Sequence, residues 1–112
     1  MVRRDRVDPF YAIADGTRRR LLELLGDGEV AVSELAQNFD MTMPAVSQHL
    51  RVLRRAGLVT HRARGRQRLY RASPRPLRLV HAWTGRYERF WRHRLERLGN
   101  YLDTRAAPRG RA

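Results

Sequence analysis

The sequence contains no cysteine, no lysine and no long apolar run. Without cysteine, the chain can form neither disulfide bonds nor thiolate ligands for a metal ion. A membrane-spanning helix needs about 18 or more consecutive apolar residues, and no segment of this chain approaches that length. The N-terminal segment MVRRDRVDPFY has basic residues but lacks the apolar stretch of a secretion signal. We therefore expect a cytoplasmic protein with no membrane association.

Basic residues far outnumber acidic ones. The 112 residues include 24 basic residues, all arginine, and 11 acidic residues, which gives a formal net charge of +13. Such a charge attracts polyanions, and double-stranded DNA is the expected partner. The exclusive use of arginine is also typical of the coding bias of a GC-rich genome, so charge supports this partner without establishing it. The length predicts one small domain with a modest core, which a partner subunit would help to stabilise.

The most informative stretch is 32–59, VSELAQNFDMTMPAVSQHLRVLRRAGLV. It predicts two short helices joined by a turn at residues 38–41, with a strand after the second helix. Ser33 is a suitable N-cap for the first helix and Thr42 for the second. Pro44 fits the first turn of the second helix, where a missing N–H has no effect, and Gly57 suits the left-handed residue that ends a helix. This is the organisation of a helix-turn-helix.

The second helix of this stretch is amphipathic. Val46, Leu50 and Leu53 recur at i, i+4 and i+7 and form one apolar stripe. The opposite face carries short polar and basic side chains, as a recognition helix in the major groove of DNA requires. We predict that DNA contacts come from this face and its neighbours: Thr42, Met43, Pro44, Ser47, Gln48, His49 and Arg51.

A predicted β-hairpin follows, with strands at 58–62 and 67–71. Gly65 supplies the permissive backbone that the tip of a hairpin needs. Four arginines occupy alternate positions around the tip and in ordinary register would line one edge: Arg62, Arg64, Arg66 and Arg68. We expect a basic wing that contacts phosphates or the minor groove of DNA, because it directly follows a recognition-type helix. The alternative is an edge hairpin that charge keeps soluble.

The segment before the helix-turn-helix predicts a flexible charged arm at residues 1–8 and two short helices. The first helix spans about 9–14, with Phe10 and Ile13 on its apolar edge. The second spans about 17–25, with Asp15 as its N-cap. Three arginines at 18–20 lie in the first turn of this helix, where the helix dipole disfavours cations. We interpret them as solvated surface, with a phosphate contact as the alternative.

The C-terminal part predicts one long helix, from about residue 76 to residue 102. Its apolar side chains recur at spacings of three and four and include more aromatic surface than so small a domain can cover alone. Uncovered apolar surface of that extent usually marks an association site. We predict a homodimer whose interface on this helix contains Leu77, Val80, Trp83, Thr84, Tyr87, Phe90, Trp91, Leu95 and Leu98. Residues 104–112 are expected to form a disordered basic tail.

Residues 8–103 resemble the ArsR-type winged-helix repressors of bacteria. The resemblance rests on the segments ADGTRRRLLELL, VSELAQNF and PAVSQHLRVLRRAGLV and on the wing segment GRQRLYR. It implies a mainly α-helical winged helix-turn-helix fold with a small β-hairpin, in which domain 9–103 dimerises through its first and last helices. The first helix would then bring Phe10 and Ile13 to the dimer interface. It also implies repression at a palindromic operator, with base contacts from Thr42, Pro44, Ser47, Gln48 and Arg51. The family often has proline where this chain has Gly16.

Many members of that family sense metals, and this chain departs from them at the ligand positions. The cysteine pair of one site type would fall on Ala31 and Ser33. A second site type, on the last helix, needs an acidic residue where this chain has Leu79, although His93 and Glu96 follow at i, i+3. Zinc requires three or four convergent ligands, so we predict no metal site and no cofactor. The resemblance is to a subgroup without metal ligands, whose effector would be a small molecule or a partner protein.

Two other classes of function compete with a sequence-specific repressor. A non-specific architectural nucleic-acid-binding protein would need only charge and apolar wedges, whereas Ser47 and Gln48 on a capped helix suit the reading of base edges. An enzyme is not expected, because the chain has no cysteine, no glycine-rich phosphate loop and no nucleophile–base pair that spacing would bring together. We therefore predict a dimeric DNA-binding regulator, with its operator, effector and regulated genes left open.

Overall fold

The computed structural model describes residues 6–110, with side chains for residues 6–104. Residues 1–5 of the predicted arm and residues 111–112 of the predicted tail lie outside the described residues. The chain divides into two compact units, Met1–Val80 and His81–Ala112. The first unit contains the predicted helix-turn-helix and hairpin, and the second is helical over its described part.

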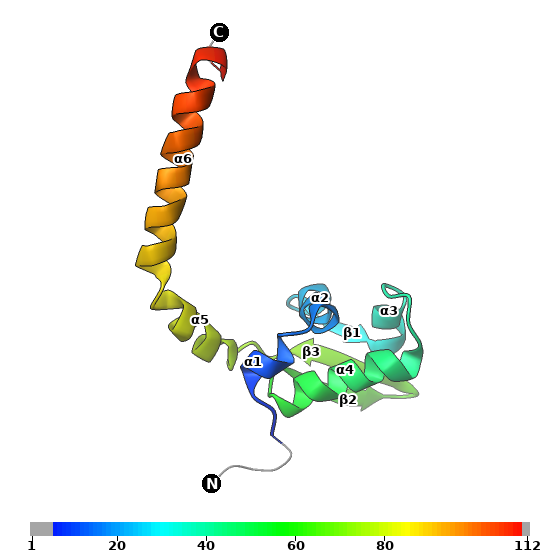
Figure 1. Ribbon diagram of the computed structural model, residues 1–112. Coiled ribbons are helices and arrows are strands. Elements are labelled where there is room, and N and C mark those ends of the chain that lie inside the picture. The colour runs from blue at the N-terminus through cyan, green and yellow to red at the C-terminus, as the bar shows by residue number, and fades with distance from the viewer. Residues whose placement is uncertain (1–5, 111–112) are drawn as a thin grey trace. The chain divides into compact units, whose positions relative to one another are not determined.

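Four helices of the first unit follow the predicted order: α1 (Pro9–Ala12), α2 (Gly16–Leu25), α3 (Val32–Ala36) and α4 (Met43–Arg55) (Figure 1). Carboxylate caps begin the first two helices, since Asp8 accepts the N–H of Phe10 at 2.8 Å and Asp15 accepts the N–H of Arg18 at 3.1 Å. α1 is shorter than the predicted 9–14. The chain leaves the helix early because Asp15 needs an extended backbone to cap α2.

The last residues of the predicted arm contact the fold. The N–H of Val7 donates to the carbonyl of Arg55 at 3.1 Å, and the Val7 side chain packs against the core. Asp8 is fixed as the N-cap of α1. The segment just before α1 is therefore attached to the C-terminal end of α4.

The recognition-type helix α4 begins and ends as the sequence predicts. Thr42 Oγ1 accepts the N–H of Ala45 at 3.2 Å, and Pro44 lies in the first turn. At the other end, Gly57 has a φ of 77°, the left-handed conformation that ends many helices. Local sequence therefore determines both boundaries of this helix.

The start of α3 differs from the prediction because residues Glu29–Ala31 form a strand, β1. It pairs with β3 (Gln67–Ala72), which also pairs with β2 (Val59–Arg64), so the predicted hairpin gains a third antiparallel strand in the order β1-β3-β2. Such a short strand carries too little alternation to be recognised in a sequence. Because β1 runs directly into α3, Ala31 is the N-cap, and the predicted cap, Ser33, lies inside the helix.

The core of the first unit lies between its helices and one face of the sheet. Val46, Leu50 and Leu53, the predicted stripe of α4, are all fully buried. They belong to one cluster with residues of α2 and α3 and with Val59 and Tyr70 of the sheet. Figure 1 shows α4 lying along the strands, with α2 and α3 beside it. Burial of this stripe turns the opposite face of α4 outward.

The predicted single C-terminal helix is two helices, α5 (Leu77–Gly85) and α6 (Glu88–Gly110). Between them, the N–H groups of Arg86 and Tyr87 bond to carbonyls three residues back instead of four. Gly85 lies at the break, and glycine is about 1 kcal/mol less favourable than alanine inside a helix. Apart from the neighbouring residues and the backbone of its own helix, no described atom lies within 4 Å of where a Cβ of Gly85 would be. The low helix propensity of Gly85 favours a break here, although Gly99 is accommodated inside α6.

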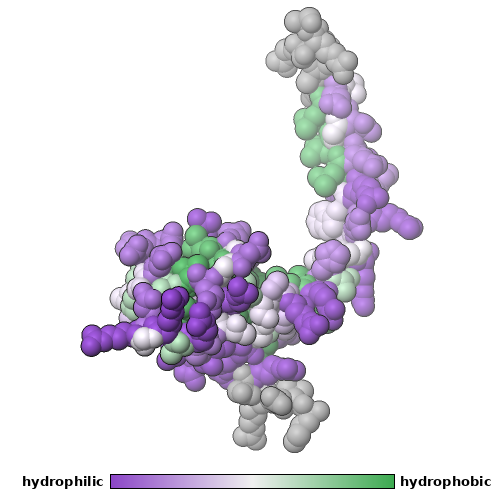
Figure 2. All heavy atoms as spheres, turned by 180° about the vertical axis from the view of Figure 1, so that it is seen from behind, coloured by the Kyte–Doolittle hydropathy of each residue, from purple (hydrophilic) through white to green (hydrophobic). Residues whose placement is uncertain are grey.

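α6 has an apolar side between residues 91 and 102. Trp91, Leu95, Leu98 and Leu102 recur at helical spacing and are all exposed. Figure 2 shows apolar side chains gathered on one side of this helix and hydrophilic side chains on the other. The helix continues to Gly110, beyond the predicted start of the tail at residue 104. Among the described residues, no helix is long and apolar enough to cross a membrane.

The two faces of α4 should respond differently to truncation. We expect Leu50→Ala to lower the free energy of unfolding by about 2–5 kcal/mol, because it removes a fully buried side chain and leaves a cavity. Gln48→Ala on the exposed face is the matched control and should change it by no more than about 0.5 kcal/mol. Chemical denaturation measures both values, and equal losses in the two variants would contradict the assignment of the faces.

Candidate nucleic-acid interface

The outward face of α4 is polar and basic. Pro44, Gln48 and Arg51 are exposed at i, i+4 and i+7, directly opposite the buried stripe. The remaining predicted contacts beside them are Thr42 and Met43, which are exposed at the N-terminal end, and Ser47, which is half-buried at the edge. These predicted side chains therefore lie together on one continuous surface.

The structure places His49 away from this surface, contrary to the prediction. The ring is half-buried, and its Nδ1 lies 3.3 Å from Nη1 of Arg18 and 3.9 Å from Oδ2 of Asp15. One residue step rotates a side chain by about 100° around a helix, which carries His49 from the Gln48 face toward α2. His49 contacts the inside of the fold instead of a ligand groove.

Arg55 belongs to the exposed face of α4 but was not predicted as a contact. It is exposed and follows Arg51 by one turn, so it continues the series that begins at Pro44 and includes Gln48. The same spacing that identified Gln48 could have found it. The exposed face therefore ends in basic side chains at the C-terminal end of the helix.

The four predicted wing arginines are exposed but do not share one face. The register pairs Arg64 with Gln67, and cross-strand partners lie on the same face of a sheet. Arg62 and Arg64 therefore lie on one face and Arg68 on the other, while Arg66 is at the tip. Alternate residues share one face of the sheet only within a single strand. Across the two-residue turn, even-numbered residues of β2 share a face with odd-numbered residues of β3. The hairpin thus has basic residues on both faces.

Arg62 is held by a carboxylate from the far strand of the sheet. Its Nε and Nη2 donate to the two carboxylate oxygens of Glu29 at 2.7 and 2.8 Å. These hydrogen bonds hold the pKa of Glu29 below its usual value and raise the pKa of Arg62. Although the Arg62 side chain is 56% exposed, its charge is shared with Glu29. Arg64 and Arg66 lie nearer the tip, and they are the wing cations better placed for a phosphate.

His61 lies on the opposite face of β2 from Arg62 and packs against the core side of the sheet. Its ring centroid is 5.2 Å from that of Tyr70. Burial, followed by the positive charges of Arg54 and Arg68, lowers the pKa of His61. Its Nδ1 is buried and, among the described residues, has no hydrogen-bond partner. His61 is therefore an uncharged packing residue near neutral pH.

The three arginines at the start of α2 have three different surroundings. Arg18 is buried, with only 8% of its surface exposed, and donates to carbonyls at the end of α1. Arg19 donates to the carbonyl of Ile13 at 2.8 Å, and Arg20 lies 3.5 Å from Glu23 at the surface. The interpretation of all three as solvated side chains or phosphate contacts is wrong for Arg18. The unsatisfied carbonyls of α1 explain why cations lie here despite the dipole of α2.

Most residues predicted for the dimer interface are exposed on α5 and α6. Ring contacts join Trp83 to Tyr87 and Phe90 to Trp91, each with centroids 5.4 Å apart. Leu77 differs, because it packs in part against the core of the first unit. Of the remaining predicted residues, four are exposed and two are half-buried. The exposed ones are Phe10, Thr84, Leu95 and Leu98, and the half-buried ones are Ile13 and Val80.

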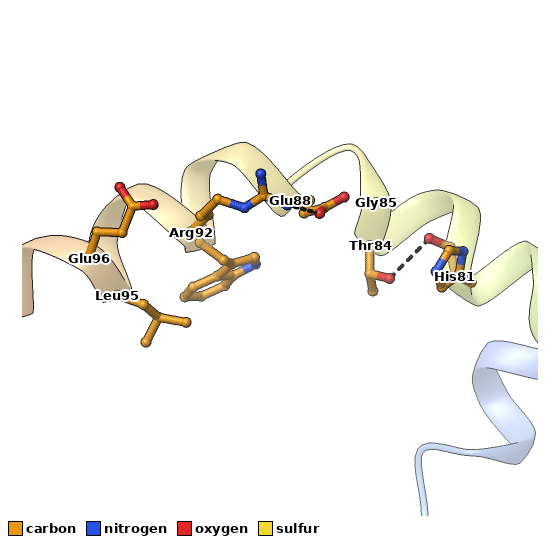
Figure 3. Close-up of a pocket in the computed structure, with 8 residues that line it drawn as sticks. His81, Thr84, Gly85, Glu88, Arg92, Leu95 and Glu96 are labelled. Atoms are coloured by element: carbon orange, nitrogen blue, oxygen red, sulfur yellow. Dashed lines mark hydrogen bonds and ion pairs between the residues drawn. The ribbon is translucent and has the colours of Figure 1, made fainter. Parts of the chain in front are cut away.

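An open groove of about 580 Å³ lies at the bend between α5 and α6 (Figure 3). Its apolar lining comes from Trp91 and Leu95, and Figure 3 shows Leu95 and Thr84 pointing to the same side of the bend. Glu88 and Arg92 form an ion pair at its edge. Among the side chains that the structure describes, no three His, Cys, Asp or Glu residues are grouped to hold a metal ion. The groove is part of the apolar surface of the second unit.

A helix buried on one face, preceded by a short helix and turn and followed by a basic hairpin, defines a winged helix-turn-helix DNA-binding protein. A family model described as a helix-turn-helix domain matches residues 13–62. Both observations concern the same part of the chain, the part that carries the exposed face of α4.

Known transcriptional regulators resemble the chain over most of its length. It is 41% identical over 95 residues to the HTH-type transcriptional regulator Rv2034 of Mycobacterium tuberculosis, covering 85% of this chain and 86% of the relative. It is 34% identical over 91 residues to the arsenical resistance operon repressor of Escherichia coli, covering 80% of this chain and 74% of that relative. The crystal structure of an ArsR family transcriptional regulator gives a TM-score of 0.66 at 36% identity, and the match covers 74% of this chain and 86% of that structure. The chain belongs to the ArsR family of winged helix-turn-helix transcriptional regulators.

Replacing Glu29 with glutamine should release Arg62 from its ion pair. We expect affinity for random-sequence duplex DNA to rise, and the salt dependence of log K to steepen by up to about 1, because one more cation becomes available to a phosphate. Fluorescence anisotropy over a KCl titration measures both quantities. Glu23→Gln is the control, since it removes an exposed carboxylate beside Arg20 on α2. The same steepening in the control would mean that net charge alone, and not the wing, is responsible.

Proposed function

We propose that the chain represses transcription as a homodimer, with one α4 in the major groove of each half of a palindromic operator. The observation that carries the proposal is the exposed series Pro44, Gln48 and Arg51 on a helix whose other face is fully buried. A helix held in this way presents its outer side chains to base edges while the core sets its angle. The flanking side chains Thr42, Met43 and Ser47 complete the surface.

Within this surface, the side chains have different roles. Gln48 can pair bidentately with an adenine, and Arg51 can pair with a guanine or a phosphate. The wing cations Arg64, Arg66 and Arg68 would contact phosphates or the minor groove, which adds affinity without base reading. Arg62 contributes less, because Glu29 holds it. Specificity thus comes from α4 and salt-dependent affinity from the wing.

Gln48→Ala should relax sequence preference without abolishing DNA binding. A bidentate contact is worth about 1–3 kcal/mol of discrimination, so one or two operator positions should lose their preference. Selection of bound duplexes from a random pool, performed with the wild type and the variant, measures this. Unchanged selected motifs would remove Gln48 from the readout.

Arg66→Ala at the wing tip is the contrasting control for this experiment. It should weaken binding to all sequences together and reduce the salt slope by up to about 1, with the selected motif unchanged. A change of motif in Arg66→Ala would mean that the wing reads bases as well.

The proposed dimer rests on the apolar surface of α5 and α6. Exposed aromatic and aliphatic side chains follow one another over both helices, and Trp91 is 57% exposed. A contiguous apolar surface of this kind usually marks an association site, and an isologous contact would bury each side chain twice. A two-fold axis would also place two α4 helices about 34–36 Å apart, the spacing of successive major grooves. A second copy of the chain is therefore the proposed occupant of this surface.

Trp91→Ala should weaken the dimer. An interface aromatic can contribute about 2 kcal/mol per copy, which is about 30-fold for each copy. The variant loses both copies, so the dimer dissociation constant should rise by roughly 10³-fold. Affinity for a two-half-site operator should fall with it, while the helix content stays unchanged. Analytical ultracentrifugation measures association, with Arg97→Ala on the same helix as the control. A wild type that is monomeric at micromolar concentration would rule out the dimer and the palindromic operator together.

A further inference from the structure

The apolar stripe of α4 continues one turn beyond the core. Met43, the first residue of the helix, lies seven residues before Leu50, and two helical turns place both side chains on the same side. Leu50 and Val46 are fully buried, whereas 43% of Met43 is exposed. Met41, just before the helix cap, packs against the core cluster, and Met43 is not among the described side chains that do. Met43 is therefore an apolar side chain that the described part of the fold leaves exposed.

Pro44 extends this apolar surface around the first turn of α4. It follows Met43 directly and is also exposed. Thr42, on the other side of Met43, uses its Oγ1 to accept the N–H of Ala45 at 3.2 Å and caps the helix. A methionine sulfur accepts hydrogen bonds only weakly, and a proline side chain has neither donor nor acceptor. Met43 and Pro44 can therefore recognise a base edge only by apolar contact.

We propose that Met43 is a specificity-determining residue that recognises the 5-methyl group of thymine in each half of the operator, with Pro44 packed beside that contact. The 5-methyl group is the apolar feature that a base presents in the major groove, and cytosine and uracil lack it. The unbranched, polarizable side chain of methionine adapts well to irregular apolar contacts. The proposal rests on the DNA-binding function proposed above, and it gives a role to a side chain that adds no strong hydrogen bond to the interface.

Met43 and Gln48 should contact different bases. The two residues are five positions apart, which is about 7.5 Å along the helix axis and about 140° around it. This separation exceeds the rise of about 3.4 Å between base pairs, so we expect each side chain to meet its own base. Removal of a thymine methyl group should therefore affect the contact of Met43 and leave the contact of Gln48 unchanged.

The test removes the methyl group from the DNA and leaves every hydrogen-bonding group of the base in place. In a duplex selected from a random pool by the wild type, each thymine of one half-site is replaced in turn by deoxyuridine. Fluorescence anisotropy at fixed pH and salt measures the dissociation constant of each duplex. At one or two positions we expect the wild type to bind about fourfold more weakly, which corresponds to one buried methyl group. The other thymines should tolerate the replacement.

Three variants assign this effect to Met43. Met43→Ala should bind the thymine and deoxyuridine duplexes equally at the sensitive positions, because its side chain is too short to reach the methyl group. Met43→Leu should retain most of the difference, since the contact is apolar. Gln48→Ala is the matched control on the same helix, and it should bind all the duplexes more weakly while keeping the fourfold difference. As a second readout, the wild type should bind 5-methylcytosine more tightly than cytosine at these positions, and Met43→Ala should not.

Circular dichroism and thermal unfolding check that the variants fold, which the exposure of Met43 leads us to expect. The proposal is overturned by a wild type that binds every deoxyuridine duplex as tightly as the parent duplex, or by selected half-sites without thymine. A difference of unchanged size in Met43→Ala also overturns it, since another residue would then read the methyl group. If the wild type selects no motif at all, the proposed operator reading itself fails, which is a different result.

Discussion

Burial of one face of α4 is the constraint on which the rest of the structure depends. Val46, Leu50 and Leu53 are completely enclosed, and α2, α3 and the sheet supply the side chains around them. A helix bound on one face cannot rotate without exposing that face to water, at roughly 1.5–3 kcal/mol for each large apolar side chain. The orientation of Gln48 and Arg51 toward solvent follows from this burial. The proposed interface is therefore positioned by buried residues of the core.

The arginines of the chain have different structural roles, although each contributes equally to the net charge. Arg18 is enclosed among backbone carbonyls and orders the start of the domain. Arg62 forms an ion pair with Glu29, which links the two outer strands of the sheet, β2 and β1. Arg51 and Arg66 remain exposed on α4 and at the wing tip. The charge that DNA meets is thus smaller than the formal charge, and it is concentrated where the fold turns it outward.

The apolar side chains of α5 and α6 are exposed, whereas the apolar stripe of α4 is buried. Exposed Trp83, Phe90 and Trp91 are costly to leave in water, and their spacing suits a helical partner. Operator binding by two copies would link this surface to α4, because half-site spacing depends on how the copies are held. Association and base reading would then share one protein while using different sets of residues.

Much of the fold could be predicted from the sequence, because periodicity and caps are local. The stripe of α4, the caps Asp15 and Thr42, and the glycines Gly57 and Gly65 depend only on residues a few positions apart. The exposed face of α4 follows from the same spacing, which is why most of the candidate interface was predicted. The break near Gly85 was missed although it is local, since a single glycine is often tolerated inside a helix.

Contacts between residues far apart in the chain depend on the tertiary structure and could not be predicted from the sequence. Arg18 meets His49 across 31 residues, and Arg62 meets Glu29 across 33. Sequence spacing contains no information about such pairs, since they form only after the core brings α1, α2, α4 and the sheet together. β1 exists for the same reason, because three residues become a strand only when β3 offers them a partner. Burial and pairing thus determined which arginines remain available to a ligand.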